Sequence, residues 1–361
     1  MPLSRMQERG TLGDRSSGIH AVDVTIWKGG AGMSEKKLLE QVADKIRMKH
    51  YSRKTGTAYV GWCRRYILFH KKRHPKDMGK PEIEGYLNHL ANEEYVAAST
   101  QNQCLHALLF MYREVLGVTI QNVESIRAKE GKHLPTVLSQ LDTRRVLECV
   151  EDEPFHLMAQ LLYGAGLRLQ ECQQLRIKDV DFGNGVILVR GGKGNKDRSV
   201  PLPRMLIKPL MDQMNIARQY WNIDRQRGMP GVYVPNALER KYPNIGCEWG
   251  WFWVFPAQNY SVDPESKIRR RHCQYESGLQ RAVRAAAIKA GVTQRVSPHT
   301  FRHCFATHLL WNGYDIRTVQ DLMGHQSIKT TMVYLHILQP GGWKGVESPL
   351  DNVPVESVIC P

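Results

Sequence analysis

Six side chains between residues 168 and 334 have types that together suit attack on a phosphate. They are Arg168, Lys193, His299, Arg302, His325 and Tyr334. Arginine is permanently charged and binds two phosphate oxygens at once, which suits it to a phosphate that gains negative charge during reaction. A tyrosine oxygen next to that phosphate is a nucleophile, and imidazoles donate hydrogen bonds or move protons. The set predicts a positively charged site for one phosphate, with a phenol placed to attack it.

Ser297-Pro298 begins the segment that must position two of these side chains. Serine is a favoured helix N-cap, and proline fits the first helical position because its missing N–H needs no partner there. His299 and Arg302 are three residues apart, so both project from one side of the helix near its N-terminus, where the helix dipole favours an anion. The apolar positions predicted to anchor this helix in a core are Phe301, Phe305 and Leu309.

The segment 315–324 predicts a second helix, with Asp315 as its N-cap and Gly324 as its stop. His325 follows that stop directly, where it can point out of a rigid corner. The run 330–336 predicts the start of a further helix that carries Tyr334. A single His or Tyr is usually a packed or surface side chain, so the prediction depends on the order and context of the whole set.

Arg168 lies in an apolar run, 162–171, that two glycines interrupt. Arginine is seldom buried without an anionic partner, and glycine lets another backbone or a ligand come close. These features indicate a functional arginine with Glu171 as its structural support. The alternative is an ordinary Arg168–Glu171 pair on a helix surface.

Residues 186–190 and 198–202 predict a β-hairpin whose glycine-rich tip carries Lys193. From that tip Lys193 can reach a DNA groove and deliver a proton. A generic basic hairpin that contacts phosphates would have a similar sequence, so the pattern leaves both interpretations open.

Together these motifs resemble the tyrosine recombinase (phage integrase) family. The matching patterns, in family order, are G-x-G-L-R-x-x-E around Arg168, G-K-G-x-K-x-R-x-V-P-L around Lys193, H-x-x-R at His299 and Arg302, L-x-G-H ending at His325, and T-T-x-x-Y-x-H at Tyr334. The resemblance covers the chain from about Ser34 to its end, and an extra segment before His299 is most similar to integron integrases. Trp311-Asn312 and Leu335 depart from the family pattern without touching the expected chemistry.

The resemblance implies an enzyme that cuts and rejoins DNA through a 3′-phosphotyrosine, without a metal or other cofactor. Tyr334 would attack the phosphorus, and surrounding positive charge should favour its phenolate form. The phosphate would be clamped by Arg168 and Arg302, and donors of this kind contribute about 3–4 kcal/mol each in a transition state. His299 and His325 would donate further hydrogen bonds or help deprotonate Tyr334. Lys193 would be the general acid for the departing 5′ oxygen.

The resemblance to integron integrases also implies gene cassettes as cargo and two forms of DNA partner, a double-stranded attachment site and a folded single-stranded hairpin with protruding bases. Aromatic residues of the extra segment, at about 236–272, would stack on such bases for roughly 1–3 kcal/mol each. Alternatively they form a small hydrophobic patch. The residues expected to contact DNA are Arg53, Lys54, Lys196, Arg198, Tyr233, Trp249, Trp251, Arg270, Arg271 and His272.

The expected fold is mainly α with a small antiparallel β-sheet, in two domains that close around DNA as a C-shaped clamp. The expected divisions are an extension without fixed structure at 1–33, a helical SAM-like core-binding domain at 34–126, a linker at 127–137, an α+β catalytic domain at 138–336, and a tail at 337–361. Helices are predicted at about 35–49, 54–72, 81–93 and 100–116, with Ser52 and Ser99 as N-caps. Joining two sites implies a homotetramer, in which the tail is exchanged between subunits or packs on its own.

Composition agrees with a polyanionic partner, because the formal net charge of the 361 residues is +15. Charge alone would also suit a ribosomal or membrane-surface protein. The apolar runs are too short to span a bilayer, and no membrane partner is expected. The 8 cysteines are scattered without a C-x-x-C pair, which favours a reduced setting such as the bacterial cytoplasm.

Several alternatives remain at this stage. Another phage or transposon integrase has the same motifs, and a type IB topoisomerase has the same Arg, Lys, His and Tyr chemistry. A DNA-binding protein without catalysis could keep the charge and the fold. A zinc hydrolase is disfavoured, because the histidines lack an H-E-x-x-H motif and the arginines would repel a cation.

Overall fold

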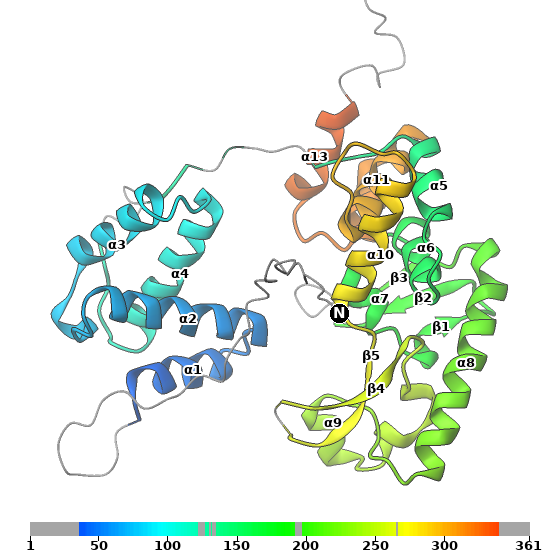
Figure 1. The fold of residues 1–361 in the computed structure, drawn as a ribbon, viewed down its shortest axis with the longest axis horizontal. Helices are drawn as coiled ribbons and strands as arrows, with labels where there is room; N and C mark the ends of the chain where they lie inside the picture. Colours follow the sequence, from blue (N-terminus) through cyan, green and yellow to red (C-terminus); the bar gives the residue numbers. More distant parts are fainter. Residues whose placement is uncertain are drawn as a thin grey trace, which may run out of the picture. The chain divides into compact units, whose positions relative to one another are not determined.

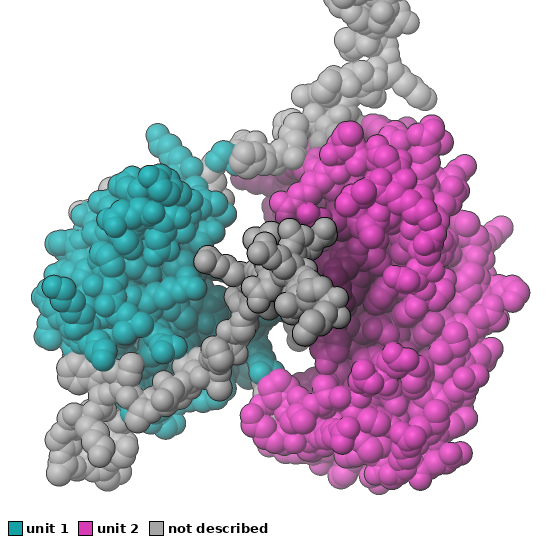
Figure 2. Space-filling view, viewed as in Figure 1, with its two compact units in different colours: residues 1–132 teal, residues 133–361 magenta. Residues whose placement is uncertain are grey.

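The computed structural model describes residues 36–121, 127–129, 131, 135–191, 197–264 and 266–338. The chain divides into two compact units, residues 1–132 and 133–361 (Figure 2). The described residues are mainly helical with small antiparallel sheets (Figure 1), which confirms the predicted fold class. The expected extension, at 1–33, lies outside the described residues, as do residues 130 and 132–134 of the linker and nearly all of the tail.

The first unit contains helices α1 Leu38–Met48, α2 Arg53–Phe69, α3 Lys80–Asn92 and α4 Ala98–Glu114, with a short 3₁₀ turn η1 at Pro75–Asp77. Ser52 caps α2 as predicted, since its Oγ accepts a hydrogen bond from the Thr55 N–H at 3.1 Å. The prediction of Ser99 as a cap was wrong, because α4 begins at Ala98, two residues earlier than predicted, with Ala97 as its N-cap.

The core of the first unit lies between α4 and the other helices. Tyr66 and Tyr112 are both buried there, and their hydroxyls share a hydrogen bond of 3.0 Å.

The second unit contains both sheets. Its helices are α5 Gln140–Glu148, α6 Phe155–Gly164, α7 Leu169–Gln173, α8 Ile207–Gln226, α9 Asn236–Lys241, α10 Glu276–Lys289, α11 Pro298–Trp311, α12 Ile316–Met323 and α13 Ile328–Leu338. Its strands are β1 Val180–Asp181, β2 Val186–Val189, β3 Arg198–Pro201, β4 Pro256–Val262 and β5 Arg269–Cys273. Short 3₁₀ turns lie at Ile177–Asp179 (η3), Arg204–Leu206 (η4), Ile245–Cys247 (η5) and Trp249–Trp251 (η6).

The predicted hairpin is present as β2 and β3, which pair antiparallel with Ile187 opposite Val200. Strand β1 adds to the other edge of β2, giving the order β1-β2-β3. Strands β4 and β5 form a separate antiparallel pair within the extra segment. The tip of the β2–β3 hairpin, residues 192–196, lies outside the described residues.

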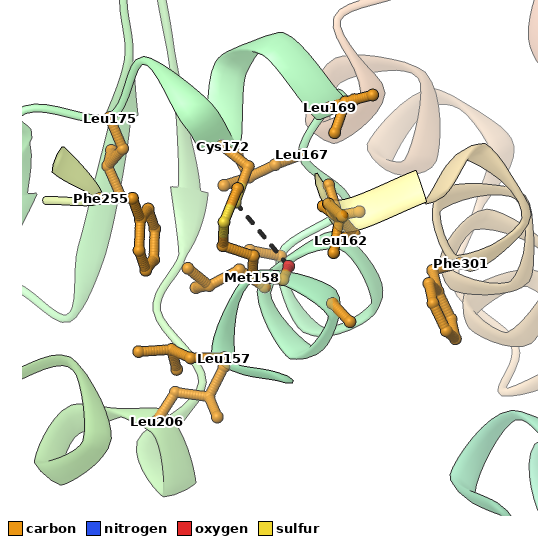
Figure 3. Close-up of a cluster of buried hydrophobic side chains, with 14 of the residues drawn as sticks. Leu157, Met158, Leu162, Leu167, Leu169, Cys172, Leu175, Leu206, Phe255 and Phe301 are labelled. Atoms are coloured by element: carbon orange, nitrogen blue, oxygen red, sulfur yellow. Dashed lines mark hydrogen bonds between the residues drawn. The ribbon is translucent and has the colours of Figure 1, made fainter. Parts of the chain in front are cut away.

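Helix α6 lies at the centre of the second core (Figure 3). Leu157, Met158 and Leu162 on this helix are nearly or fully buried. The Cys172 thiol of α7 donates to the Met158 carbonyl at 3.8 Å, which ties α7 to α6. Phe301 of α11 is fully buried in the same core, so the face predicted to anchor this helix does so.

Candidate active site

Helix α11 begins as predicted, with Ser297 as its N-cap and Pro298 in the first turn. The Ser297 N–H donates to the Thr300 Oγ1 at 3.0 Å, which fixes the entry of the chain into the helix. While Phe301 anchors the helix in the core, His299 stays exposed and Arg302 is 5% exposed. One helical turn therefore presents an imidazole at the surface and holds a guanidinium beneath it.

Three arginines from three different elements surround the carboxylate of Glu171 on α7. Arg198 of β3 binds both of its oxygens, at 2.9 and 2.7 Å. Arg168 donates to it at 2.7 Å from its side chain and at 2.8 Å from its backbone N–H. The Arg302 Nη1 lies 3.7 Å from the Glu171 Oε2.

The same three guanidinium groups also bind the carbonyl end of α12. Asp315 caps the start of this helix, and Gly324 ends it in the left-handed conformation with φ 59°, both as predicted. Arg198 Nε donates to Leu322 O at 2.8 Å, and Arg168 Nη2 donates to Met323 O and Gly324 O at 3.1 and 3.0 Å. Arg302 binds the Met323 carbonyl as well. The negative end of the helix dipole thus helps to gather the three cations.

The charge balance of this cluster is positive. Burial acts to raise the pKa of Glu171, but hydrogen bonds from Arg198 and from the Arg168 N–H outweigh it and lower that pKa to about 2. Burial and the neighbouring charge of Arg168 lower the pKa of Arg302 to about 9, so this arginine is still charged at neutral pH. Three cations around one carboxylate leave an excess of positive charge that an anion would neutralise.

Gly166 makes the close approach expected from the glycines before Arg168. Its φ is +61°, and a Cβ on it would lie 2.4 Å from the Phe305 ring. Its carbonyl accepts a hydrogen bond from Arg302. A glycine is required here because of its positive φ and because a Cβ would overlap the Phe305 ring. It lets the turn before α7 lie directly against α11.

Tyr334 of α13 is 4% exposed and lies between two imidazoles. Its hydroxyl shares a hydrogen bond of 2.9 Å with the Nδ1 of His303 on α11. The ring of His325 stacks on its ring, with centroids 6.3 Å apart and planes at 15°. The Nδ1 of His325 in turn shares a hydrogen bond of 2.9 Å with the Thr331 hydroxyl.

The protonation states of these groups follow from their burial. Burial raises the pKa of Tyr334, although the charges of Arg302 and Arg168 act in the opposite direction. The positive charge thus favours the phenolate, as expected, but burial outweighs it and the net pKa of Tyr334 is raised. Burial, with nearby positive charge, lowers the pKa of His303 and of His325 to about 4, and lowers the pKa of His299 as well. The phenol is protonated at neutral pH, and the half-buried imidazoles of His303 and His325 are neutral.

The structure brings five of the expected residues to one place: Arg168, Glu171, Arg302, His325 and Tyr334. His299 is on the same helix as Arg302 and its pKa responds to the charges of Arg302 and Arg168. Lys193 and Lys196 lie outside the described residues. Sequence reasoning missed His303, which stands next to Arg302 in the motif; its position one residue further along α11 was the available signal.

The expected DNA contacts have varied environments. Arg53 and Lys54 are exposed on the first unit. Arg198 binds both oxygens of Glu171, so its side chain belongs to the arginine cluster; its contact with DNA stays a prediction.

Two arginines of the basic run in the extra segment, Arg270 and Arg271, are buried in this structure. Arg271 is 4% exposed and binds Asp224 of α8 through two bonds of 2.7 Å, because an arginine can be buried only with an anionic partner. Arg270 is 1% exposed and lies 3.3 Å from Glu239. His272 is half-buried beside them, and burial lowers its pKa. The two arginines hold the segment together instead of projecting from it.

The three aromatic residues expected to contact DNA are packed but not fully enclosed. Trp249 and Trp251 are half-buried, as is Tyr233. The Lys178 Nζ lies 3.1 Å from the centre of the Trp251 ring, and the Arg218 guanidinium lies 4.7 Å from the centre of the Trp249 ring. Cation–π contacts of this kind place positive charge beside each tryptophan.

Within the described ranges, no group of three or more His, Cys, Asp or Glu side chains is arranged to hold a metal ion. Nor is any helix there both long and apolar enough to cross a membrane.

Comparison with known proteins adds independent evidence. Residues 137–339 match the model of the phage integrase family, and residues 38–122 match that of the phage integrase N-terminal SAM-like domain. Proteins called "Integrase/recombinase" in Escherichia coli and in Pseudomonas aeruginosa are each 49% identical over 319 residues, which is 88% of this chain and 94% of the relative. The "Tyrosine recombinase" of Pseudothermotoga lettingae is 30% identical over 312 residues, 84% of this chain and 94% of that protein.

Solved structures share the fold at lower identity. A lambda integrase dimer bound to a core site has a TM-score of 0.57 at 16% identity, covering 86% of this chain and 98% of that one. A XerH site-specific recombinase bound to its difH substrate has a TM-score of 0.55 at 22% identity, covering 83% and 80%. The chain therefore belongs to the phage integrase family: it is a tyrosine recombinase, an enzyme of site-specific DNA recombination.

Proposed function

We propose that this enzyme cuts DNA with Tyr334 and carries the cut strand as a 3′-phosphotyrosine. The observation that carries the proposal is the position of the Tyr334 hydroxyl, which lies 2.9 Å from the Nδ1 of His303, the residue that follows Arg302 on α11. A phosphate bound by Arg302 and Arg168 would lie next to the phenol oxygen. A covalent intermediate preserves the energy of the broken bond, so that the 5′-hydroxyl of another strand can reverse the step and reseal the DNA.

Each remaining residue of the site has a proposed part in this step. Arg168 and Arg302 neutralise the phosphate as its phosphorus becomes five-coordinate, and His299 and His325 donate hydrogen bonds to its oxygens. Glu171 holds the arginines in position. Lys193 is proposed as the general acid for the 5′ oxygen on its motif alone, since it lies outside the described residues.

The test is the substitution Tyr334→Phe, assayed on the DNA that flanks the integrase gene. The variant should bind this DNA as the unaltered enzyme does, but should form no covalent protein–DNA band on a denaturing gel. An adduct that persists in Tyr334→Phe would assign the nucleophile to another residue and end the proposal.

We further propose that the enzyme is an integron integrase, which inserts or excises gene cassettes and accepts both a double-stranded site and a folded single-stranded hairpin. The support is the extra segment at 236–272 and its half-buried tryptophans, each with a cation at its ring. An unpaired base stacked on such a ring would have its phosphate close to positive charge. A phage or transposon integrase is the alternative.

The hairpin hypothesis is tested by Trp249→Ala and Trp251→Ala. Binding is measured to a folded cassette-end strand and to the same strand without its protruding bases. Each variant should lose affinity for the first substrate by about 5- to 150-fold and little for the second, as about 1–3 kcal/mol per stacked base implies. The control is Trp311→Ala, which removes an exposed tryptophan at the C-terminal end of α11, outside the extra segment. Equal losses on both substrates would reject base stacking.

The assembly is also a proposal. Residues 34–126 would form a core-binding domain and 138–336 the catalytic domain, with the two closing around DNA as a C-shaped clamp. Joining two sites requires four subunits, and the tail at 337–361 could pass between them. Mass measurement of the enzyme on paired attachment sites should give a homotetramer.

A further inference from the structure

The hydroxyl of Tyr334 has a hydrogen-bond partner that the proposed mechanism does not yet use. His303 Nδ1 lies 2.9 Å from the Tyr334 oxygen, with ring centroids 5.7 Å apart. The contact joins α11 to α13, and it is mostly shielded from water because Tyr334 is 4% exposed. A ring nitrogen at this distance and in this setting can take the proton that the phenol must lose.

The other two imidazoles of the site are oriented differently. His325 turns the face of its ring to Tyr334, at an interplanar angle of 15°, and its Nδ1 is engaged by the Thr331 hydroxyl. His299 is exposed on the side of α11 that bears Arg302. Of the three, His303 is the one whose ring nitrogen meets the phenol oxygen.

We propose that His303 is the catalytic base that accepts the Tyr334 proton during DNA cleavage, an inference that rests on Tyr334 being the nucleophile. The proton moves from the Tyr334 oxygen to His303 Nδ1 while that oxygen bonds to phosphorus. The bond between phosphorus and the 5′ oxygen breaks, and the 5′ oxygen keeps the electron pair and takes a proton from the general acid. In rejoining, an incoming 5′-hydroxyl attacks the phosphorus and returns its proton to the general acid. The bond between phosphorus and Tyr334 breaks, and the Tyr334 oxygen recovers its proton from His303.

The protonation state of the resting enzyme agrees with this assignment. Burial, with the neighbouring His299 and Arg302, lowers the pKa of His303 to about 4, so that its ring is neutral and can accept a proton. The titratable and charged groups around it are His299 and Arg302 on its own helix, Tyr334 on α13, His325 after α12, and Arg168 and Glu171 at α7.

A bound phosphate makes protonation of His303 easier. Its negative charge offsets the arginines, which makes a proton on His303 less unfavourable. As the phenol oxygen bonds to phosphorus, its own proton becomes far more acidic. Transfer to His303 is thereby coupled to the arrival of DNA, and without DNA the phenol stays protonated and unreactive.

The experiment measures single-turnover formation of the phosphotyrosine adduct on the flanking-DNA duplex that the unaltered enzyme cleaves. The cleavage position is mapped first with the unaltered enzyme. A 5′-bridging phosphorothiolate placed there removes the need for a general acid, so that the rate depends on the loss of the phenol proton. His303→Asn keeps an acceptor oxygen near the Nδ1 position but cannot take the proton, and it should slow the adduct at least 100-fold. His303→Gln is the second variant if the first folds poorly.

Site-specific replacement of Tyr334 by 3,5-difluorotyrosine provides the decisive comparison. This phenol is far more acidic, so it needs a base less, and the loss caused by His303→Asn should shrink at least tenfold. The matched control is His308→Asn on the same helix, because the Nδ1 of His308 shares a hydrogen bond of 2.9 Å with the Tyr163 hydroxyl, away from the nucleophile. Any loss in this control should be the same with both phenols.

The outcomes separate this inference from the proposed function. An adduct rate in His303→Asn close to that of the unaltered enzyme, or a loss unchanged by fluorination, would overturn the catalytic base. A faster rate in His303→Ala would show instead that His303 restrains the nucleophile, and would overturn it too. An adduct in Tyr334→Phe would overturn the nucleophile itself, which is a separate result.

Discussion

Arg198 binds both oxygens of Glu171, at 2.9 and 2.7 Å, from a strand that begins 27 residues further along the chain. Through this pair the β2–β3 hairpin is fastened to α7, and through the Arg198 bond to Leu322 O it is fastened to α12. Arg168 and Arg302 contact the same carboxylate and the same helix end. Arg198 therefore sets the position of the other two guanidinium groups, as well as of the strand that follows Lys193.

The first prediction concerns Arg198→Lys. Lysine cannot bind two carboxylate oxygens in a fork, so Glu171 should turn toward Arg168 and Arg302 and draw them from the phosphate. Adduct formation should fall by tenfold or more while DNA affinity changes little, which a binding titration and a single-turnover assay measure together. Arg204→Lys, an exposed position in the same unit, is the control and should retain the full rate. Equal rates in both variants would reject a positioning role.

A second prediction follows from the contact of Gly166 with Phe305. Gly166→Ala should lower the free energy of unfolding through left-handed strain of about 1–2 kcal/mol and through overpacking of about 1–3 kcal/mol. Gly185→Ala is a matched control, because its φ is +66° against +61° but a Cβ there meets nothing within 4 Å. Gly185→Ala should lower the free energy of unfolding by the left-handed strain alone. Denaturant unfolding of both variants gives the difference, and identical losses would mean that the Phe305 contact is not tight.

Local features of the site could be predicted from the sequence. The Asp315 cap, the Gly324 stop and the start of α11 at Pro298 depend on residues within a few positions of one another, and all are present. The β2–β3 hairpin could be predicted equally well, because its apolar strand residues and the glycines between them are local signals.

Contacts between distant segments could not be predicted in the same way. The partners of Arg198 lie 27 residues before it and 124 residues after it, so the sequence did not separate a hub of the site from a surface DNA contact. His303 and Tyr334 are 31 residues apart on different helices. The run 269–273 is strongly basic, a pattern typical of a DNA-binding surface, yet Arg271 is buried in an ion pair with Asp224 on α8. Tertiary partners decide the role of such residues.

The third prediction is a dependence of stability on pH through Glu171. Its pKa is about 2 in the folded protein against an ordinary value of 4.5, so the folded state binds fewer protons than the unfolded state between these values. The stabilisation is fully present above pH 4.5 and is lost as the pH falls toward 2; it amounts to about 3 kcal/mol at most. Glu171→Gln should abolish this part of the pH dependence, as measured by urea unfolding from pH 5.5 to 2.5. A parallel decline in both proteins would contradict the assignment.

The fourth prediction concerns Arg271, which the sequence placed at the DNA and the structure pairs with Asp224, both 3% exposed in their side chains. Asp224→Asn leaves a buried guanidinium without its counter-charge and should cost about 3–5 kcal/mol of unfolding free energy. The double variant Asp224→Leu with Arg271→Met removes both charges and should recover most of that loss, because apolar replacements of a buried pair are often neutral or better.

DNA binding by the same double variant separates a structural role from a contact role. A lysine or arginine that neutralises one phosphate contributes about one unit to the slope of log affinity against log salt. Because Arg271 is enclosed by Asp224 and the carbonyls of Ala257 and Gln258, the double variant should keep the slope of the unaltered protein. A slope reduced by one unit in a folded double variant would return Arg271 to the DNA surface, and would mean that the segment opens when DNA binds.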